Sequence, residues 1–406
     1  MTPQETGFLS GPIFALVLYA CAVGTAALWL RCFPGLTMPV AAAGSAPDRW
    51  RSLDGLRGLL AVGVFVHHFT ANYRLQAEGV WGVPNGFANQ LGKGSVALFF
   101  MTTSFLFFGR LMERRYDMDI RAFLISRLAR LCPLYCAVVL MLIAAVFGAQ
   151  GWTLKEPLGS LLRNIADWTL FTIPGRPDIN QVADTALLTA GVTWTLRYEW
   201  LFYLLLPLMA VLAHPRQHAV AGLLFVPVLL IFLWLASQGA ALETSIGRTF
   251  LGGVGAAFWL RRPRLRALAS GRTAAVIFFG SVGMMLFGFE SAFDLPALAL
   301  LTVIFTIAAA DNCWLGWLLA KPVQWLGSIS YSVYLLHGLT LWAGSMAVKN
   351  LWGGFGERWW AHAAFGCVAA CLLVAAASCT FGAIERPFIA LFRKGPVERA
   401  ALRKCE

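Results

Sequence analysis

The chain has 406 residues, of which 59% are hydrophobic and only 13% are charged. A soluble domain of this length cannot bury so much apolar surface, so the composition excludes an ordinary water-soluble fold and indicates a membrane protein. The formal net charge of +12 does not indicate a nucleic-acid-binding protein, because the basic residues alternate with apolar segments instead of forming one patch.

The cysteines are scattered along the chain and show no metal-binding spacing. There are nine of them, several lie inside apolar runs, and no Cys-x-x-Cys pair occurs. This pattern argues against a disulfide framework and against a zinc site. We therefore expect no metal, and we expect the thiols to act as small packing residues.

The apolar segments predict an all-α polytopic membrane protein. A helix needs about 20 mostly apolar residues to cross the hydrocarbon core of a bilayer. Eleven segments are long enough or nearly so: residues 9–30, 53–73, 94–112, 127–149, 194–213, 219–237, 246–260, 273–289, 294–311, 327–348 and 361–389. Residues 35–50 are rich in Pro, Ala and Gly and indicate a linker.

This pattern divides the chain into three parts. Residues 1–45 form an additional N-terminal span and linker, residues 46–392 form a ten-span unit, and residues 393–406 form a basic tail. Short loops rich in Lys and Arg stay in the cytoplasm. Because the basic loops follow every second span, we predict that the N-terminus lies outside and the C-terminus in the cytoplasm.

A few ionisable side chains fall inside the predicted spans, where each costs about 2.5–3.5 kcal/mol on insertion scales. Such residues are functional candidates by default. They are Asp54, Arg57, His67, His68, Arg127, Arg130, Arg197, Glu199, His337 and Glu385.

Arg57 and His68 lie eleven residues apart on one predicted helix, which separates them by roughly 16 Å along the axis and places them near one face. Arg127 and Arg130 also share a face and, like Arg57, lie at the cytoplasmic boundary. Three guanidinium groups at one depth could bind phosphate oxygens through paired donors. Alternatively, these arginines follow the positive-inside rule and extend to lipid headgroups.

Five short motifs, taken in order, resemble those of the membrane proteins of acyltransferase family 3. Residues 51–69, RSLDGLRGLLAVGVFVHHF, resemble the opening of that family, with its Arg-x10-His spacing at Arg57 and His68. The other four are the segments starting at Arg127 (RLARLCPLY), Trp194 (WTLRYE), Ser328 (SISYSVYLLH) and Ile384 (IERPF). Together they cover nearly all of the ten-span unit, whereas residues 1–45 are an addition to the usual pattern.

The resemblance implies an O-acyltransferase that moves an acyl group, most often acetyl, from acyl-CoA to a hydroxyl of a glycan, polysaccharide or glycolipid. A bacterial inner membrane and a polysaccharide biosynthesis complex are the implied surroundings. Arg57, Arg127 and Arg130 would bind the CoA phosphates, since CoA stays in the cytoplasm.

We predict that His68 is the general base, because imidazole titrates near neutral pH. Asp54 would hold Arg57 in place, and Glu199 would orient the imidazole or the acceptor. His67 adjoins His68 and leaves open which imidazole acts. Tyr331, Tyr334 and His337 would line the path of the acceptor, or simply pack.

Two other functions fit parts of the pattern. A transporter or flippase of a lipid-linked sugar could use buried His and Glu to relay protons, but it would not need arginines confined to the CoA side. A non-catalytic subunit of a polysaccharide assembly is the third reading. Within the acyltransferase reading, direct transfer and a covalent acyl-enzyme both remain open.

Overall fold

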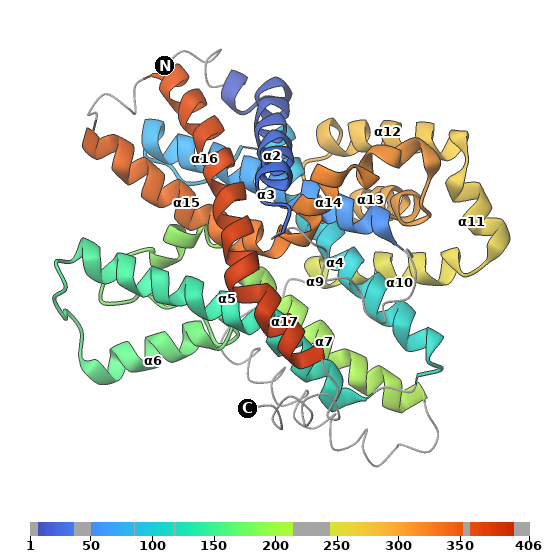
Figure 1. The fold of residues 1–406 in the computed structure, drawn as a ribbon, viewed down its shortest axis with the longest axis horizontal. Coiled ribbons are helices and arrows are strands. Elements are labelled where there is room, and N and C mark those ends of the chain that lie inside the picture. The colour runs from blue at the N-terminus through green and yellow to red at the C-terminus, as the bar shows by residue number, and fades with distance from the viewer. Residues whose placement is uncertain are drawn as a thin grey trace.

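The computed structural model describes residues 7–35, 50–84, 86–116, 119–213, 244–351 and 358–393, and these residues form an all-helical protein without a strand (Figure 1). The predicted all-α class is confirmed. The predicted span 219–237, most of the linker and almost all of the basic tail lie outside the described residues. The helices in chain order are α2 (Pro12–Cys32), α3 (Arg51–Glu78), α4 (Phe87–Glu113), α5 (Ile120–Ala149), α6 (Leu158–Thr169), η1 (Thr185–Thr189), α7 (Trp194–Ala213), α9 (Thr244–Gly247), α10 (Thr249–Leu260), α11 (Pro263–Ser270), α12 (Arg272–Phe287), α13 (Leu295–Ala309), η2 (Cys313–Leu319), α14 (Lys321–Ser328), α15 (Ser330–Leu351), α16 (Trp359–Thr380), η4 (Phe381–Glu385) and α17 (Arg386–Arg393).

The predicted count of eleven spans is not confirmed. Among the described residues, four helical stretches are long and apolar enough to cross a membrane, or six if two bent helix pairs each count as one span. The four stretches are Pro12–Cys32, Phe87–Glu113, Ile120–Ala149 and Trp359–Leu391. The chain is therefore a multi-pass membrane protein whose helices are less regular than a length rule assumes.

Several helices differ from the predicted spans. The predicted span 246–260 is a 12-residue helix, α10, which follows the single turn of α9. The predicted span 327–348 begins in α14, which ends at Ser328 before α15 starts at Ser330. α3 has 28 residues, enough to cross a bilayer. Its histidine and arginine side chains make it too polar to count among the four apolar stretches.

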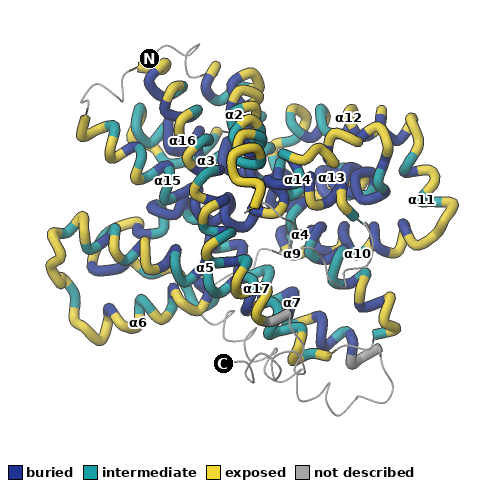
Figure 2. The backbone as a smooth tube through the Cα atoms, viewed as in Figure 1, coloured by how far each residue is buried: buried dark blue, intermediate teal, exposed yellow. Residues whose placement is uncertain are grey.

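Exposed apolar side chains cover the outside of the bundle, as expected for a surface that faces lipid. Examples are Leu16, Leu140, Val276 and Leu372, which all lie on apolar helices. Figure 2 shows exposed positions along the outer faces of these helices, whereas the buried ones gather where the helices cross. The solvent of this surface is the hydrocarbon of the bilayer.

α3 is the central helix of the described bundle. It packs against α4, α14 and α15, and long stretches of it are buried. Where α10 crosses α4, a side chain at Gly253 would collide with the backbone of Met101 and the hydroxyl of Ser104. Only a small residue permits this close approach at Gly253, and Gly252 is similarly crowded, whereas Gly255 has no neighbouring atom within 4 Å.

Residues 150–193, which we call the insert, connect α5 to α7 and fold into the bundle. The insert holds seven of the eleven described non-glycine residues that have a positive φ. Such irregular backbone is tolerated at membrane depth only where protein covers it. The η1 end of the insert is covered in this way: η1 packs on α15, and a Cβ atom at Gly338 would collide with the backbone of Thr189.

Hydrogen bonds to buried side chains hold the insert in shape. Tyr135 of α5 donates to the carbonyl oxygen of Trp168 at 2.6 Å, and the indole of Trp168 donates to Pro177 at 2.8 Å. The side chain of Asn180 accepts from the backbone of Lys155 and donates to that of Thr153. These bonds satisfy polar backbone groups that no helix ladder satisfies.

The additional N-terminal helix, α2, is part of the same bundle. It packs against α16, α14 and α3. Leu18 and Ala26 are fully buried, and the hydroxyl of Tyr19 donates to the carbonyl oxygen of Leu59 in α3 at 3.0 Å.

Candidate active site

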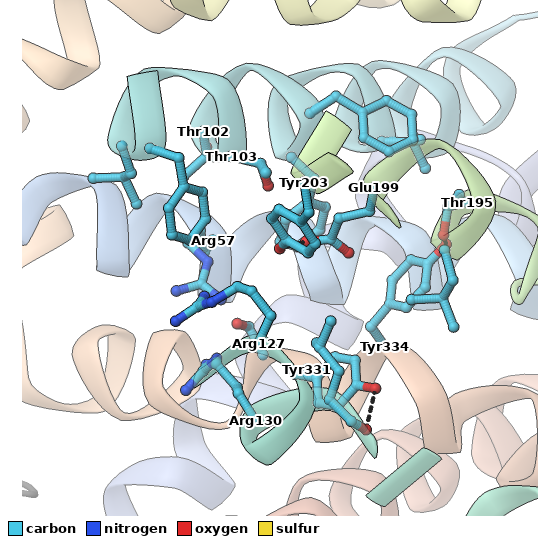
Figure 3. A pocket seen from close by; sticks show the side chains of 18 residues that line it. Arg57, Thr102, Thr103, Arg127, Arg130, Thr195, Glu199, Tyr203, Tyr331 and Tyr334 are labelled. Atoms are coloured by element: carbon cyan, nitrogen blue, oxygen red, sulfur yellow. Dashed lines mark hydrogen bonds between the residues drawn. The ribbon is translucent and has the colours of Figure 1, made fainter. Parts of the chain in front are cut away.

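A cavity lies between α3, α4, α5, α7 and α15, with an empty volume of about 880 Å³ including its opening. Figure 3 shows the guanidinium groups of Arg57, Arg127 and Arg130 at one end, with Glu199 and Tyr203 between them and Tyr334. The other lining residues are Val96, Phe99, Phe100, Thr102, Thr103, Leu106, Phe107, Leu131, Thr195, Leu196, Ser330 and Tyr331.

The three arginines reach the cavity from two helices. Arg57 lies in the second turn of α3, and Arg127 and Arg130 lie near the start of α5, whose N-terminus is capped by Asp119. Within the described residues, Arg127 and Arg130 have no carboxylate within 4 Å. The Arg127 guanidinium instead lies over the ring of Phe107, 4.6 Å from its centroid. Their positive charge is therefore available to an anionic ligand.

Asp54 lies beside Arg57 but outside the cavity. Its carboxylate oxygen is 3.7 Å from an Arg57 nitrogen, and 56% of its side chain is exposed. An exposed ion pair of this kind contributes little to the stability of the folded protein.

Glu199 lies with the arginines and not with the histidines. It lines the cavity from α7 and accepts a hydrogen bond from the hydroxyl of Tyr203, one turn further along the helix. Tyr203 also lies in the cavity wall, but sequence analysis missed it. Its i+4 spacing from Glu199 was the signal that could have indicated it.

Tyr331 and Tyr334 line the cavity from α15, and each uses its hydroxyl to fix another element. Tyr331 donates to the carbonyl oxygen of Leu131 in α5 at 2.8 Å (Figure 3). Tyr334 donates to Val192 at 3.1 Å and shares a hydrogen bond with Thr195 at 2.8 Å. These tyrosines thus both line the cavity and pack.

His68 and His337 form a pair in which Nδ1 of His68 is 3.1 Å from Nε2 of His337. Nδ1 of His68 is also 3.0 Å from the carbonyl oxygen of Val64, and Nδ1 of His337 is 3.3 Å from that of Val333. A carbonyl oxygen can only accept, so both Nδ1 atoms carry hydrogen. His337 then accepts at Nε2, and Nε2 of His68 keeps its lone pair.

His67 points to a different neighbour. Its Nδ1 lies 3.0 Å from the carbonyl oxygen of Ala88 in α4, and a Cβ atom at Gly92 would collide with its ring. The two adjacent imidazoles are therefore held by different helices.

The imidazole pair lies beside the cavity and is not part of its lining. Tyr334 connects the two, because its ring lines the cavity and lies 5.9 Å from the ring of His337. Of the predicted site residues, the cavity gathers Arg57, Arg127, Arg130, Glu199, Tyr331 and Tyr334. His68 and His337 come together beside it, with the ring of His67 4.8 Å from that of His68, and Asp54 lies next to Arg57 but outside the cavity.

No group of three or more His, Cys, Asp or Glu side chains in the described part of the chain is placed to hold a metal ion. Fold and site together define a polytopic helical membrane protein with a polar cavity among its helices. The family model of the acyltransferase 3 domain, described as "Acyltransferase domain", matches residues 50–379. The chain belongs to acyltransferase family 3 and is a membrane acyltransferase. No curated protein and no solved structure matches it.

Proposed function

We propose that this protein transfers an acyl group, acetyl in the simplest case, from acyl-CoA to a hydroxyl of a glycan, polysaccharide or glycolipid. The observation that carries the proposal is the cavity in which three arginines from α3 and α5 meet beside an imidazole pair. We further propose that the protein resides in a bacterial inner membrane, with its N-terminus outside and its C-terminus in the cytoplasm. A polysaccharide biosynthesis complex is a suitable partner.

The charge of the cavity supports a phosphorylated donor. CoA carries several phosphate charges, and guanidinium groups bind phosphate through two parallel hydrogen bonds. Arg57, Arg127 and Arg130 line one end of the cavity, so its other end is free for the acyl-bearing arm. The arm would pass Tyr334 to reach His68.

His68 would then act as general base at Nε2. As that nitrogen takes the proton of the acceptor hydroxyl, the hydroxyl oxygen bonds to the thioester carbonyl carbon, and the carbon–sulfur bond breaks. The CoA thiolate leaves and takes the proton from the imidazolium. His337 accepts a hydrogen bond from Nδ1 of His68 and so holds that ring with Nε2 free.

A thioester assay tests the proposal directly. Purified protein is mixed with acetyl-CoA and a hydroxyl acceptor, and free CoA is measured with a thiol reagent. We expect CoA release that depends on the acceptor. A transporter or flippase of a lipid-linked sugar would release none, and neither would a non-catalytic subunit. A stoichiometric burst of CoA without acceptor would indicate a covalent acyl-enzyme instead of direct transfer.

A further inference from the structure

The hydroxyl of Ser330 is buried in the wall of the cavity without a hydrogen-bond partner. Ser330 lines the cavity as the first residue of α15, and only 1% of it is exposed. Its Oγ atom is bonded to no other group in the described part of the chain. Buried hydroxyls are normally satisfied, so this one indicates a group that a ligand in the cavity satisfies.

Ser332, two residues further along α15, has a partner within the protein. It is also buried, and its hydroxyl donates to the carboxyl group of Glu385 in η4. Side chains two residues apart on a helix point about 200° away from each other. The start of α15 is therefore bonded to protein on the side of Ser332, whereas the side of Ser330 faces the cavity.

The break between α14 and α15 brings Ser330 to the arginine end of the cavity. Three residues before it, Gly327 packs so closely on α3 that a Cβ atom there would lie 2.0 Å from the carbonyl oxygen of Asp54. A Cβ atom at Gly58 would lie 2.5 Å from the amide nitrogen of Gly327. These two contacts lie on either side of Arg57 in the sequence, so α15 begins at the level of that arginine.

The same end of α15 is tied to the helix that carries the other two arginines. Tyr331 follows Ser330, and its hydroxyl donates to the carbonyl oxygen of Leu131 in α5 at 2.8 Å. Leu131 directly follows Arg130 in the sequence. The first turn of α15 is thus held against both arginine-bearing helices, and it lines the same cavity.

The start of a helix also favours an anion. α15 runs for 22 residues from Ser330. The first amides of an α-helix have no partner within it, and its N-terminus carries a partial positive charge. Phosphate oxygens bind at such ends through amides and hydroxyls. The orphan hydroxyl, the helix start and the three guanidinium groups all suit the same kind of ligand group.

We propose that the Ser330 hydroxyl and the N-terminus of α15 bind a phosphate oxygen of the acyl-CoA donor, beside the three arginines. This inference rests on the proposed function, since it adds a neutral group to the donor end of the site. The arginines supply the attraction for the phosphates. Ser330, fixed by its helix, sets the depth at which one of them is held.

Binding measurements on the purified full-length protein in a neutral detergent test the inference. The probes are acetyl-CoA, ADP, and ADP that carries the additional ribose phosphate of CoA; the two nucleotides lack the acyl-bearing arm. We expect Ser330→Ala to weaken binding of acetyl-CoA and of at least one nucleotide by about tenfold, because a hydrogen bond to a charged oxygen is lost. Thermal unfolding of the ligand-free variant should occur no earlier than that of the wild type, since its hydroxyl has no partner to lose.

Ser332→Ala is the matched control on the same helix and should show the opposite pattern. Its hydroxyl serves Glu385, so its removal should lower the unfolding temperature of the ligand-free protein. All three probes should bind to it as they do to the wild type. A purely structural role of Ser330 would give Ser330→Ala the behaviour of this control.

The nucleotides show which phosphate is bound. A loss shared by ADP places Ser330 at the diphosphate, and a loss confined to the probes with the ribose phosphate places it there. The inference is overturned if Ser330→Ala binds like the wild type, if its loss is confined to acetyl-CoA, or if Ser332→Ala weakens binding equally. If the wild type binds none of the probes, the proposed function itself fails, whereas wild-type binding that Ser330→Ala retains removes only the assignment of Ser330.

Discussion

The arginine cavity and the imidazole pair differ in how they are built. Side chains from five helices surround the cavity, its guanidinium groups have few partners, and it is open. The imidazole pair comes from two helices, α3 and α15, and carbonyl oxygens of the same helices hold its rings. A site that must admit a large anion needs free charge and space, whereas a proton acceptor needs a fixed ring. Substitutions should therefore separate effects on donor binding from effects on turnover.

Loss of the His68 imidazole should have the largest effect of these substitutions. A small effect would contradict the division between donor binding and turnover. We expect His68→Ala to lower kcat for acyl transfer by about 10²–10⁴-fold, the usual contribution of a general base. The KM for acyl-CoA should stay near the wild-type value, because the arginines are untouched. His67→Ala is the control for the neighbouring ring. If His68→Ala inserts normally and keeps wild-type turnover, His68 is not the base.

Loss of a cavity arginine should act on the donor instead. We expect Arg130→Gln to raise the KM for acyl-CoA by about 10–100-fold, because one or two charge-assisted hydrogen bonds to phosphate are lost. Steady-state kinetics at saturating acceptor measure this change, and kcat should fall much less. Arg121→Gln, at an exposed position on the same helix, should behave as the wild type. Equal effects of both variants would show that general positive charge, not the cavity, binds the donor.

Substitutions at His337 test whether its ring positions His68 without reacting itself. We expect His337→Leu to lower kcat by about tenfold, because it removes the acceptor that holds Nδ1 of His68. His337→Gln offers an amide oxygen in its place and should restore part of this loss. If the leucine and glutamine variants are equally impaired, the hydrogen bond to His68 is not what His337 contributes.

The smallest effect is expected at Asp54. Its ion pair with Arg57 is long and exposed, and such pairs contribute about 0–1 kcal/mol. Asp54→Asn should therefore raise the KM for acyl-CoA by less than about fivefold, with no change in kcat. A larger loss would mean that Asp54 touches a substrate.

The sequence predicted the residue types of the site better than their arrangement. Helical periodicity placed Arg127 and Arg130 on one face, and the predicted cytoplasmic boundary placed both at the depth of Arg57, which was enough to predict one cluster. It could not reveal that His68 would meet His337, since that contact joins positions 269 residues apart and depends on how α3 packs on α15.

The helices themselves show the same limit. Hydropathy found the apolar segments, but it did not predict the break between α14 and α15 or the short α10. The folded insert was also beyond a length rule, because its backbone is satisfied by side chains such as Asn180 and not by a regular ladder.

The buried face of α2 bears on how the protein can be handled. The family match begins at residue 50, so a shortened protein cut at that boundary is the natural choice for expression. Such a cut would uncover the surfaces of α14 and α16 that Leu18 and Ala26 now cover, and it would remove the tyrosine that braces α3 at Leu59. Tags and fusion partners therefore belong before this helix, not in its place.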